Sequence, residues 1–189
     1  MELFFDLVFV LAITQLTHHL LAHLSPRGAV ETLVLLLLVW GAWIHVAWTA
    51  NYFDVSTRPM RLALLAMTFI SLVMSASIPA AFAERGLVFA VAVTAILGGW
   101  SLLLNVVIGL GRHLRPVFAR VLFWEVITGV LLLAGGLVDG NVRLALWLVG
   151  VGVMYVAMWL GFPVSGRGRN LTTDYTISGE HMATAACCL

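Results

Sequence analysis

Long apolar runs without charged residues dominate the chain. A membrane-spanning helix needs about 20 such residues, and five runs reach that length: 7–26, 32–53, 62–83, 86–111 and 144–166. A sixth apolar stretch, 121–138, carries one carboxylate, Glu125. Apolar and polar residues do not alternate with a period of two in these runs, so the pattern predicts helices rather than the strands of a membrane barrel.

We therefore predict an all-α fold, a polytopic integral membrane bundle of about six transmembrane helices. Their expected bounds are 3–23, 30–52, 62–82, 87–109, 120–138 and 143–163. Short connections rich in Ser, Pro, Gly and Asp separate them. In this prediction residues 1–166 form a single transmembrane domain, and residues 167–189 form a cytoplasmic tail with the start of a truncated further helix. The first helix lacks the basic region and cleavage site of a signal peptide.

Composition agrees with a membrane location and narrows the function. The chain is 62% hydrophobic and 10% charged, whereas soluble domains are about 45–50% apolar and about 25% charged. Its mean hydropathy is +1.05. The net charge of +1 excludes a strongly basic nucleic-acid-binding face. The expected partner is a lipid bilayer, with an ion or small solute as the candidate ligand, and the oligomeric state is left open.

Cofactor and metal chemistry are not expected. All ten basic residues are arginine, which excludes lysine chemistry. The two cysteines, Cys187 and Cys188, are adjacent and cannot build a four-cysteine metal site. His19 and His23 have the spacing of helical metal pairs, but no third ligand follows at a matching spacing. We therefore predict no cofactor and no metal.

The arginines predict an orientation. Seven lie in connections on the N-terminal side of the bundle, against three on the other side. Because short cytoplasmic loops carry an excess of basic residues, both termini are expected in the cytoplasm. The two groups are Arg58, Arg61, Arg112, Arg115, Arg120, Arg167 and Arg169, and Arg27, Arg85 and Arg143.

A few polar side chains fall at membrane depth, where an ionisable group costs roughly 2.5–3.5 kcal/mol on insertion scales and is a functional candidate. Glu2 and Asp6 are four residues apart and share a helix face. Asp6 also begins a stripe with Val10, Thr14 and Thr17, which we expect to face other helices or a cavity. The alternative for Asp6 is an ion pair near the membrane surface, with Arg112, Arg115 or Arg120.

Glu125 is the deepest carboxylate, about 7.5 Å deeper than Arg120 at the rise of an α-helix. It is either a second titratable group facing Asp6 or the partner of Arg120 or Arg61. His45, Asn51 and Asn105 lie at a comparable depth, where interhelical hydrogen bonds would also explain them. The candidate ion- or proton-binding cluster comprises Glu2, Asp6, His45, Asn51, Asn105 and Glu125.

Small residues predict where helices pack closely. Ser71 and Ser75 are four residues apart on the third helix. Two glycine pairs, Gly98-Gly99 and Gly135-Gly136, indicate further packing surfaces on later helices. Pro79, near the end of the third helix, is expected to free a carbonyl or kink the helix.

Several short motifs together resemble those of a known family. They are Glu2-Leu3-Phe4-Phe5-Asp6-Leu7-Val8-Phe9-Val10 followed by Ile13-Thr14-Gln15-Leu16, Trp48-Thr49-Ala50-Asn51 with Asp54, Ile78-Pro79-Ala80-Ala81-Phe82, and Ile177-Ser178-Gly179-Glu180-His181. In this order they resemble the bacterial low-temperature-requirement A (LtrA) family. The positions that carry the resemblance are Phe5, Gln15, Trp48, Asn51, Asp54, Pro79, Glu180 and His181.

The resemblance implies a multi-spanning protein of the bacterial cytoplasmic membrane. Family members are about twice this length, so the chain resembles an N-terminal half or a truncated member. The family name refers to growth in the cold and implies no particular reaction.

Three functions are compatible with these observations. A secondary transporter or channel-like protein would use the buried carboxylates, and transporters place their sites near the membrane midplane. A non-catalytic component would act on membrane organisation or assembly. A membrane-embedded lipid-modifying enzyme is disfavoured because the chain has no HExxH, GxSxG or DDxxD motif, so we expect no enzymatic activity.

Overall fold

The computed structural model describes residues 2–50, 58–106 and 115–162. These residues form six rods, which confirms the predicted all-α bundle, and no strand occurs among them. The helices are α1 (Glu2–Ala22), α2 (Pro26–Ala50), α3 (Arg58–Ser77) with a 3-10 turn (Ile78–Ala80), α4 (Gly86–Thr94), α5 (Trp100–Val106), α6 (Arg115–Leu137) and α7 (Gly140–Trp159). A π-helical turn, Ala95–Gly99, joins α4 and α5 into one rod.

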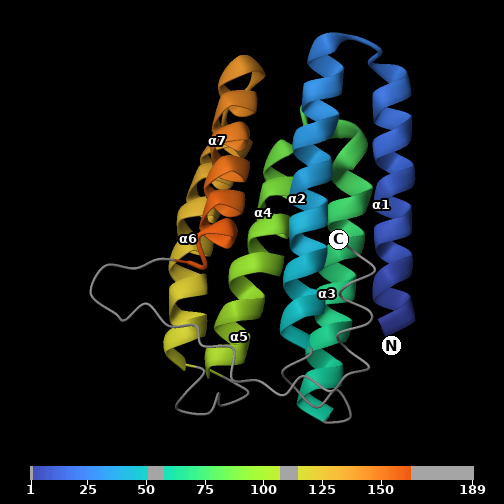
Figure 1. Cartoon of the computed structure of the whole chain (residues 1–189). Coiled ribbons are helices and arrows are strands. Elements are labelled where there is room, and N and C mark those ends of the chain that lie inside the picture. Colours follow the sequence, from blue (N-terminus) through green and yellow to red (C-terminus); the bar gives the residue numbers. More distant parts are fainter. Residues whose placement is uncertain (1, 51–57, 107–114, 163–189) are drawn as a thin grey trace.

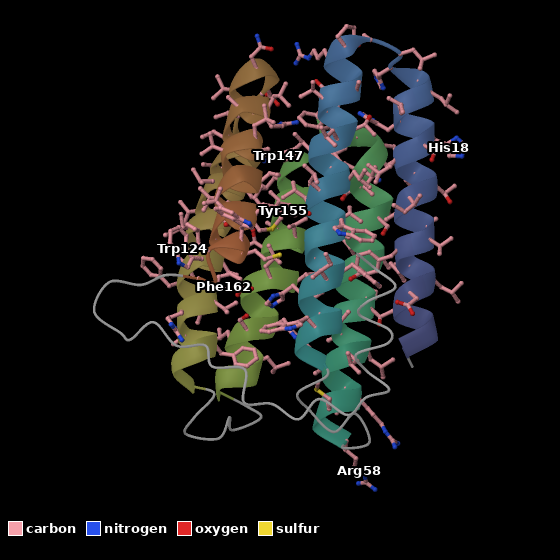
Figure 2. The ribbon with its side chains drawn as sticks, viewed as in Figure 1. His18, Arg58, Trp124, Trp147, Tyr155 and Phe162 are labelled. Carbon is pink, nitrogen blue, oxygen red and sulfur yellow. The ribbon has the colours of Figure 1, made fainter. Side chains whose placement is uncertain are left out.

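Five rods are long and apolar enough to cross a membrane: Pro26–Trp48, Met60–Ala80, Gly86–Leu103, Phe118–Leu137 and Gly140–Trp159. The remaining rod, α1, has a shorter apolar part, Asp6–Ala22. The rods run alternately up and down (Figure 1). The end of the bundle where α1 begins and where Arg58 lies is called the arginine-rich end below (Figure 2). Residues 23–25, 81–85 and 138–139 connect the rods at the opposite end.

The rods pack in two groups around α4. Helix α1 contacts α2 and α3, helix α6 contacts α7 and α4, and α4 also contacts α3. Helix α2 reaches α7 across the bundle, and Figure 1 shows α4 between the two groups. Large apolar side chains fill the interior, and others cover the outer surface, as expected for a bundle surrounded by lipid. The largest buried ones include Trp100, Trp147, Phe89 and Phe118, and the most exposed ones include Trp159, Leu62 and Phe69.

The starts of α2 and α7 lie earlier than predicted. Helix α2 begins at Pro26 because Ser25 caps it: the Ser25 Oγ accepts the Gly28 N–H at 3.0 Å, and proline is well tolerated in the first turn. Helix α7 begins at Gly140, directly after Asp139 in extended conformation.

The small residues confirm some of the predicted packing surfaces. A side-chain carbon at Gly135 would lie 2.4 Å from Trp147 Cδ1, and one at Gly136 would lie 2.9 Å from Leu87 Cα. Both glycines are therefore needed for α6 to approach α7 and α4. The prediction for Gly98 and Gly99 is wrong, because a side-chain carbon at either would meet no atom of the described residues within 4 Å. These two residues lie in the π-helical turn instead.

The predicted orientation of α1 is also wrong. Asp6, Val10, Thr14 and Thr17 are all exposed on the outside of the bundle. The Thr14 and Thr17 hydroxyls donate to carbonyls of their own helix, at 3.0 Å each. They therefore need no partner from another helix and tolerate an outward position. The buried face of α1 is apolar instead and includes Val8, Phe9, Ala12 and Leu16.

Candidate functional site

A histidine and a glutamate from two helices meet inside the bundle. His45 on α2 and Glu125 on α6 approach to 3.1 Å between Nε2 and Oε1. Each side chain is only 7% exposed. Two of the predicted cluster residues are thus brought together. The partner of Glu125 is His45, which differs from both sequence-based alternatives, Asp6 and a nearby arginine.

A serine completes this contact. The Ser101 Oγ lies 3.2 Å from His45 Nε2, and Ser101 is fully buried. Ser101 is the second residue after the π-helical turn. A π-turn holds one more residue than an α-turn, so it rotates the following side chains by about 100° relative to a regular helix. The turn therefore decides which face of α5 is presented to His45.

The His45–Glu125 contact can hold a proton in two ways. Imidazole Nε2–H can donate to the carboxylate, or a carboxyl O–H can donate to an unprotonated Nε2. Buried ionisable groups in membrane proteins pair with one another and mark ion or proton pathways. The arrangement can therefore take up and release a proton while the hydrogen bond between the two side chains is kept.

A small cavity of about 20 Å³ adjoins the pair. Four rods line it, and most of its surface is apolar. The lining residues are Gly41, His45, Leu97, Trp124, Glu125, Thr128, Met154, Ala157, Met158 and Phe162. A cavity of this size has room for one water molecule.

The end of α7 places Phe162 at this cavity, on the same side of the bundle as Trp124 (Figure 2). The Phe162 N–H donates to the Ala157 carbonyl at 2.8 Å, and the Gly161 N–H donates to the Met158 carbonyl at 3.2 Å. Gly161 has a positive φ of 70°, as expected of the glycine that ends a helix in this way. Phe162 also has a positive φ, 55°, which is unusual for a bulky residue.

Asp6 lies in a different environment from Glu125. It is exposed at the arginine-rich end of α1 and accepts a hydrogen bond from Trp43 Nε1 at 3.1 Å. Trp43 is on α2, two residues from His45, but side chains two residues apart do not share a helix face. The structure thus ties Asp6 to α2 and not to the buried pair.

The other predicted residues are only partly placed. Glu2 and Phe5 belong to α1 and Asn105 belongs to α5, but their side chains lie outside the described part of the structure, as do Asn51, Asp54, Glu180 and His181. Of the remaining positions that carry the resemblance, Gln15 is half-buried on α1, Trp48 is exposed on α2, and Pro79 is exposed in the 3-10 turn. The turn at Pro79 fits the predicted disturbance at the end of α3.

Sequence reasoning missed Arg143, which it counted as a connecting-loop charge. The structure buries this residue to 3% exposure at the start of α7. Its Nε donates to the carbonyls of Gly135 (3.2 Å) and Val138 (2.8 Å), at the end of α6. Its Nη1 donates to the carbonyls of Ala81 (3.1 Å) and Ala83 (2.7 Å).

The remaining donor of Arg143, Nη2, forms an ion pair with Asp139. One side chain therefore joins the end of α6, the start of α7 and the connection that follows the 3-10 turn. The only sequence signal for this contact is the spacing of four residues between Asp139 and Arg143. Two of the accepted carbonyls come from the segment after Pro79, which gives the Ile78–Phe82 motif a structural role.

Known proteins place the chain in a family and provide a curated relative. The chain is 35% identical over 187 residues to an uncharacterized protein of Rhizobium meliloti (strain 1021). The match covers 96% of this chain and 45% of the relative, so the chain spans less than half the length of that protein. No solved structure matches. The model of the bacterial low temperature requirement A protein (LtrA) family matches residues 1–183. The chain is thus a multi-helix membrane protein that belongs to the LtrA family.

Proposed function

We propose that the chain is part of a membrane transport protein, a secondary transporter or channel-like protein in which the His45–Glu125 pair binds the transported or coupling ion. The observation that carries this proposal is the buried contact of 3.1 Å between the two side chains. An ionisable pair at bilayer depth is expensive and tends to mark an ion or proton pathway. The proposal assigns no enzymatic reaction to the chain.

Three features around the pair support transport over a purely structural contact. The pair joins helices that are far apart in the sequence, so relative movement of α2 and α6 would separate it. The π-helical turn beside Ser101 is a feature that is frequent at functional sites. The cavity lies directly next to Glu125 and has room for a bound ion or water molecule.

We further propose a location and orientation for this function. The protein would lie in the bacterial cytoplasmic membrane with its arginine-rich end and both termini in the cytoplasm, following the positive-inside rule. The pair would then be reached from the cytoplasmic half of the bilayer. The link to growth in the cold that the family description carries would follow indirectly from transport.

Flux into proteoliposomes tests the proposal. Purified protein is reconstituted with a pH-sensitive dye inside the vesicles, and proton, sodium and potassium gradients are imposed in turn. The measurement is made on this chain and on the longer Rhizobium meliloti relative. We expect a gradient-driven flux in at least the longer protein, lost in Glu125→Gln and in the equivalent variant of the relative.

Asp6→Asn is the matched control, because it also neutralises a carboxylate but does so outside the pair. Folded protein without any flux in either length would contradict the transport proposal. It would favour a non-catalytic role in membrane organisation or assembly, for which the Arg143 network that ties three segments together is the supporting observation.

A further inference from the structure

Two polar atoms beside the cavity lack partners. Glu125 Oε2 and Thr128 Oγ1 are buried, and neither forms a hydrogen bond within the part of the chain that the structure describes. Glu125 and Thr128 are three residues apart on α6 and therefore neighbours on one helix face. Both residues also line the cavity of about 20 Å³.

Leaving such atoms unpaired is costly. A buried donor or acceptor without a partner loses about 1–3 kcal/mol, and more for a charged group. Native proteins commonly satisfy such groups with a bound water, which needs a polar site of sufficient size and at least two partners. Here Glu125 Oε1 is already engaged by His45, so Oε2 is the oxygen left for the cavity.

We propose that one water molecule binds between Glu125 and Thr128, and that the ion exchanged at the His45–Glu125 pair is a proton passed through this water. The inference rests on the proposed transport function and names its ion. In the step itself, the water donates a proton to Glu125 Oε2 as it accepts one from the cytoplasmic side. Glu125 thereby changes from a carboxylate that accepts the His45 Nε2–H at Oε1 into a neutral carboxyl group that still accepts it, and the net charge of the pair rises by one until the same water takes the proton back.

The surroundings fit a proton better than a metal cation. Hard cations are held by several oxygen ligands, whereas the cavity lining offers the Glu125 carboxylate and the Thr128 hydroxyl as its side-chain oxygens. The other lining side chains are hydrocarbon, aromatic, imidazole or thioether. Among the described residues, no group of three His, Cys, Asp or Glu side chains is placed to hold a metal ion.

Few other ionisable side chains lie on the described helices that pack around the pair. By sequence, α4, α5 and the π-helical turn carry no ionisable side chain. Helix α2 contributes His45, and its other charged residues, Arg27 and Glu31, pair with each other at the opposite end. On α7, Tyr155 donates to the Leu37 carbonyl at 2.9 Å, and Arg143 is held by its own network. On α6 itself, Arg120 lies five residues before Glu125.

Infrared spectroscopy of the purified full chain tests the site without requiring transport. The carbonyl stretch of a protonated carboxyl group is followed as the pH and then the sodium concentration are changed, and Glu125→Gln assigns the band. We expect a band that titrates with pH, does not respond to sodium, and shifts on exchange into D2O.

Two variants remove the water in different ways. Thr128→Val removes its second partner at almost constant volume, and Ala157→Val fills the cavity without touching a polar atom. Both should shift the Glu125 band in the same direction and lower proton flux about tenfold, the effect of one ordinary hydrogen bond. Thr128→Ser keeps the hydroxyl and should shift the band less than Thr128→Val. Val130→Ala, at an exposed position of the same helix, is the control and should leave the band and flux near wild type.

The outcomes separate this inference from the proposed function. A Glu125 band that titrates and shifts in both variants, with no flux in any vesicle, supports the proton site and overturns transport. Sodium-driven flux with no titrating band supports transport and overturns the proton site. A band that is unchanged in Thr128→Val, with the variant folded as judged by helicity and a single size-exclusion peak, also overturns the inference.

Discussion

Arg143 and Glu125 both have ionisable side chains buried in the same bundle, at 4% and 7% exposure, but their surroundings differ. The guanidinium of Arg143 donates to four carbonyls and pairs with Asp139. Glu125 contacts His45 through one oxygen, its other oxygen has no partner among the described residues, and a cavity lies beside it.

The difference indicates two kinds of burial. A buried charged group with many hydrogen-bond partners holds the segments that supply those partners in place. Any relative movement of these segments would break several hydrogen bonds at once. A charge with an unused atom and adjacent space can change its partner or its protonation at smaller cost. We therefore interpret the end of the bundle around Arg143 as a fixed frame and the region around Glu125 as the place where change occurs.

The largest expected effect comes from breaking the frame. Arg143→Ala removes a donor from four backbone carbonyls, of which the Gly135 carbonyl keeps the Val138 N–H, and should destabilise the protein by roughly 3–5 kcal/mol, the usual cost of opening a buried charged network. The stability of Arg143→Lys should lie between that of the wild type and that of Arg143→Ala, because a single ammonium group cannot make all the hydrogen bonds of the guanidinium. Unfolding in detergent, followed by circular dichroism during titration with a denaturing detergent, measures the loss.

Asp139→Asn is the control for this variant. The Asp139 side chain is 88% exposed, so its replacement should change stability little. Equal stability of the wild type and Arg143→Ala would show that the carbonyls find other partners and that the frame is not fixed by this side chain.

A second test probes how tightly the same end is packed. Gly135→Ala places a methyl group 2.4 Å from Trp147 Cδ1, and overpacking of this kind costs roughly 1–3 kcal/mol. Gly98→Ala is the matched control, because its new carbon meets nothing within 4 Å. Thermal unfolding of the two variants side by side measures the difference. Similar losses in both would mean that the cost comes from the glycine backbone rather than from Trp147.

Sequence reasoning predicted the number and type of the rods well, because continuous apolar runs suffice to indicate spans. It could not tell which face of α1 is buried. The exposed residues Leu7 and Val10 and the buried residues Val8 and Phe9 are all apolar, so in a bilayer the hydrophobic pattern does not distinguish lipid from core.

The site could be predicted only in part for a related reason. His45 and Glu125 stood out as polar residues at membrane depth, but their contact depends on how α2 and α6 are rotated. The π-helical turn orients Ser101 toward His45. The turn consists of three apolar residues and two glycines, and this sequence does not predict a π-helical turn. Arg143 was missed because its partners are backbone carbonyls, and these leave no trace in the pattern of side chains.

A third test asks whether the Glu125 region is dispensable for stability. Glu125→Gln keeps a hydrogen-bond acceptor for a neutral His45 and removes a carboxyl group whose burial costs free energy, so stability should change by less than about 1 kcal/mol, or rise. The same detergent titration used for Arg143→Ala makes the comparison direct. A loss as large as that of Arg143→Ala would remove the distinction between frame and site, since both charges would then be structural.

The smallest effect is expected at Asp6. This carboxylate is exposed and, among the described residues, accepts one hydrogen bond, from Trp43 Nε1, which the oxygen of an asparagine can also accept. Asp6→Asn should therefore leave stability unchanged within error and reduce flux far less than Glu125→Gln. Tryptophan fluorescence should shift little, whereas Asp6→Leu should change the environment of Trp43 because the acceptor is lost. A flux loss in Asp6→Asn equal to that in Glu125→Gln, with protein still folded, would contradict this expectation. It would place Asp6 on the ion path despite its exposed position, and the region of change would then extend from the buried pair to the surface of α1.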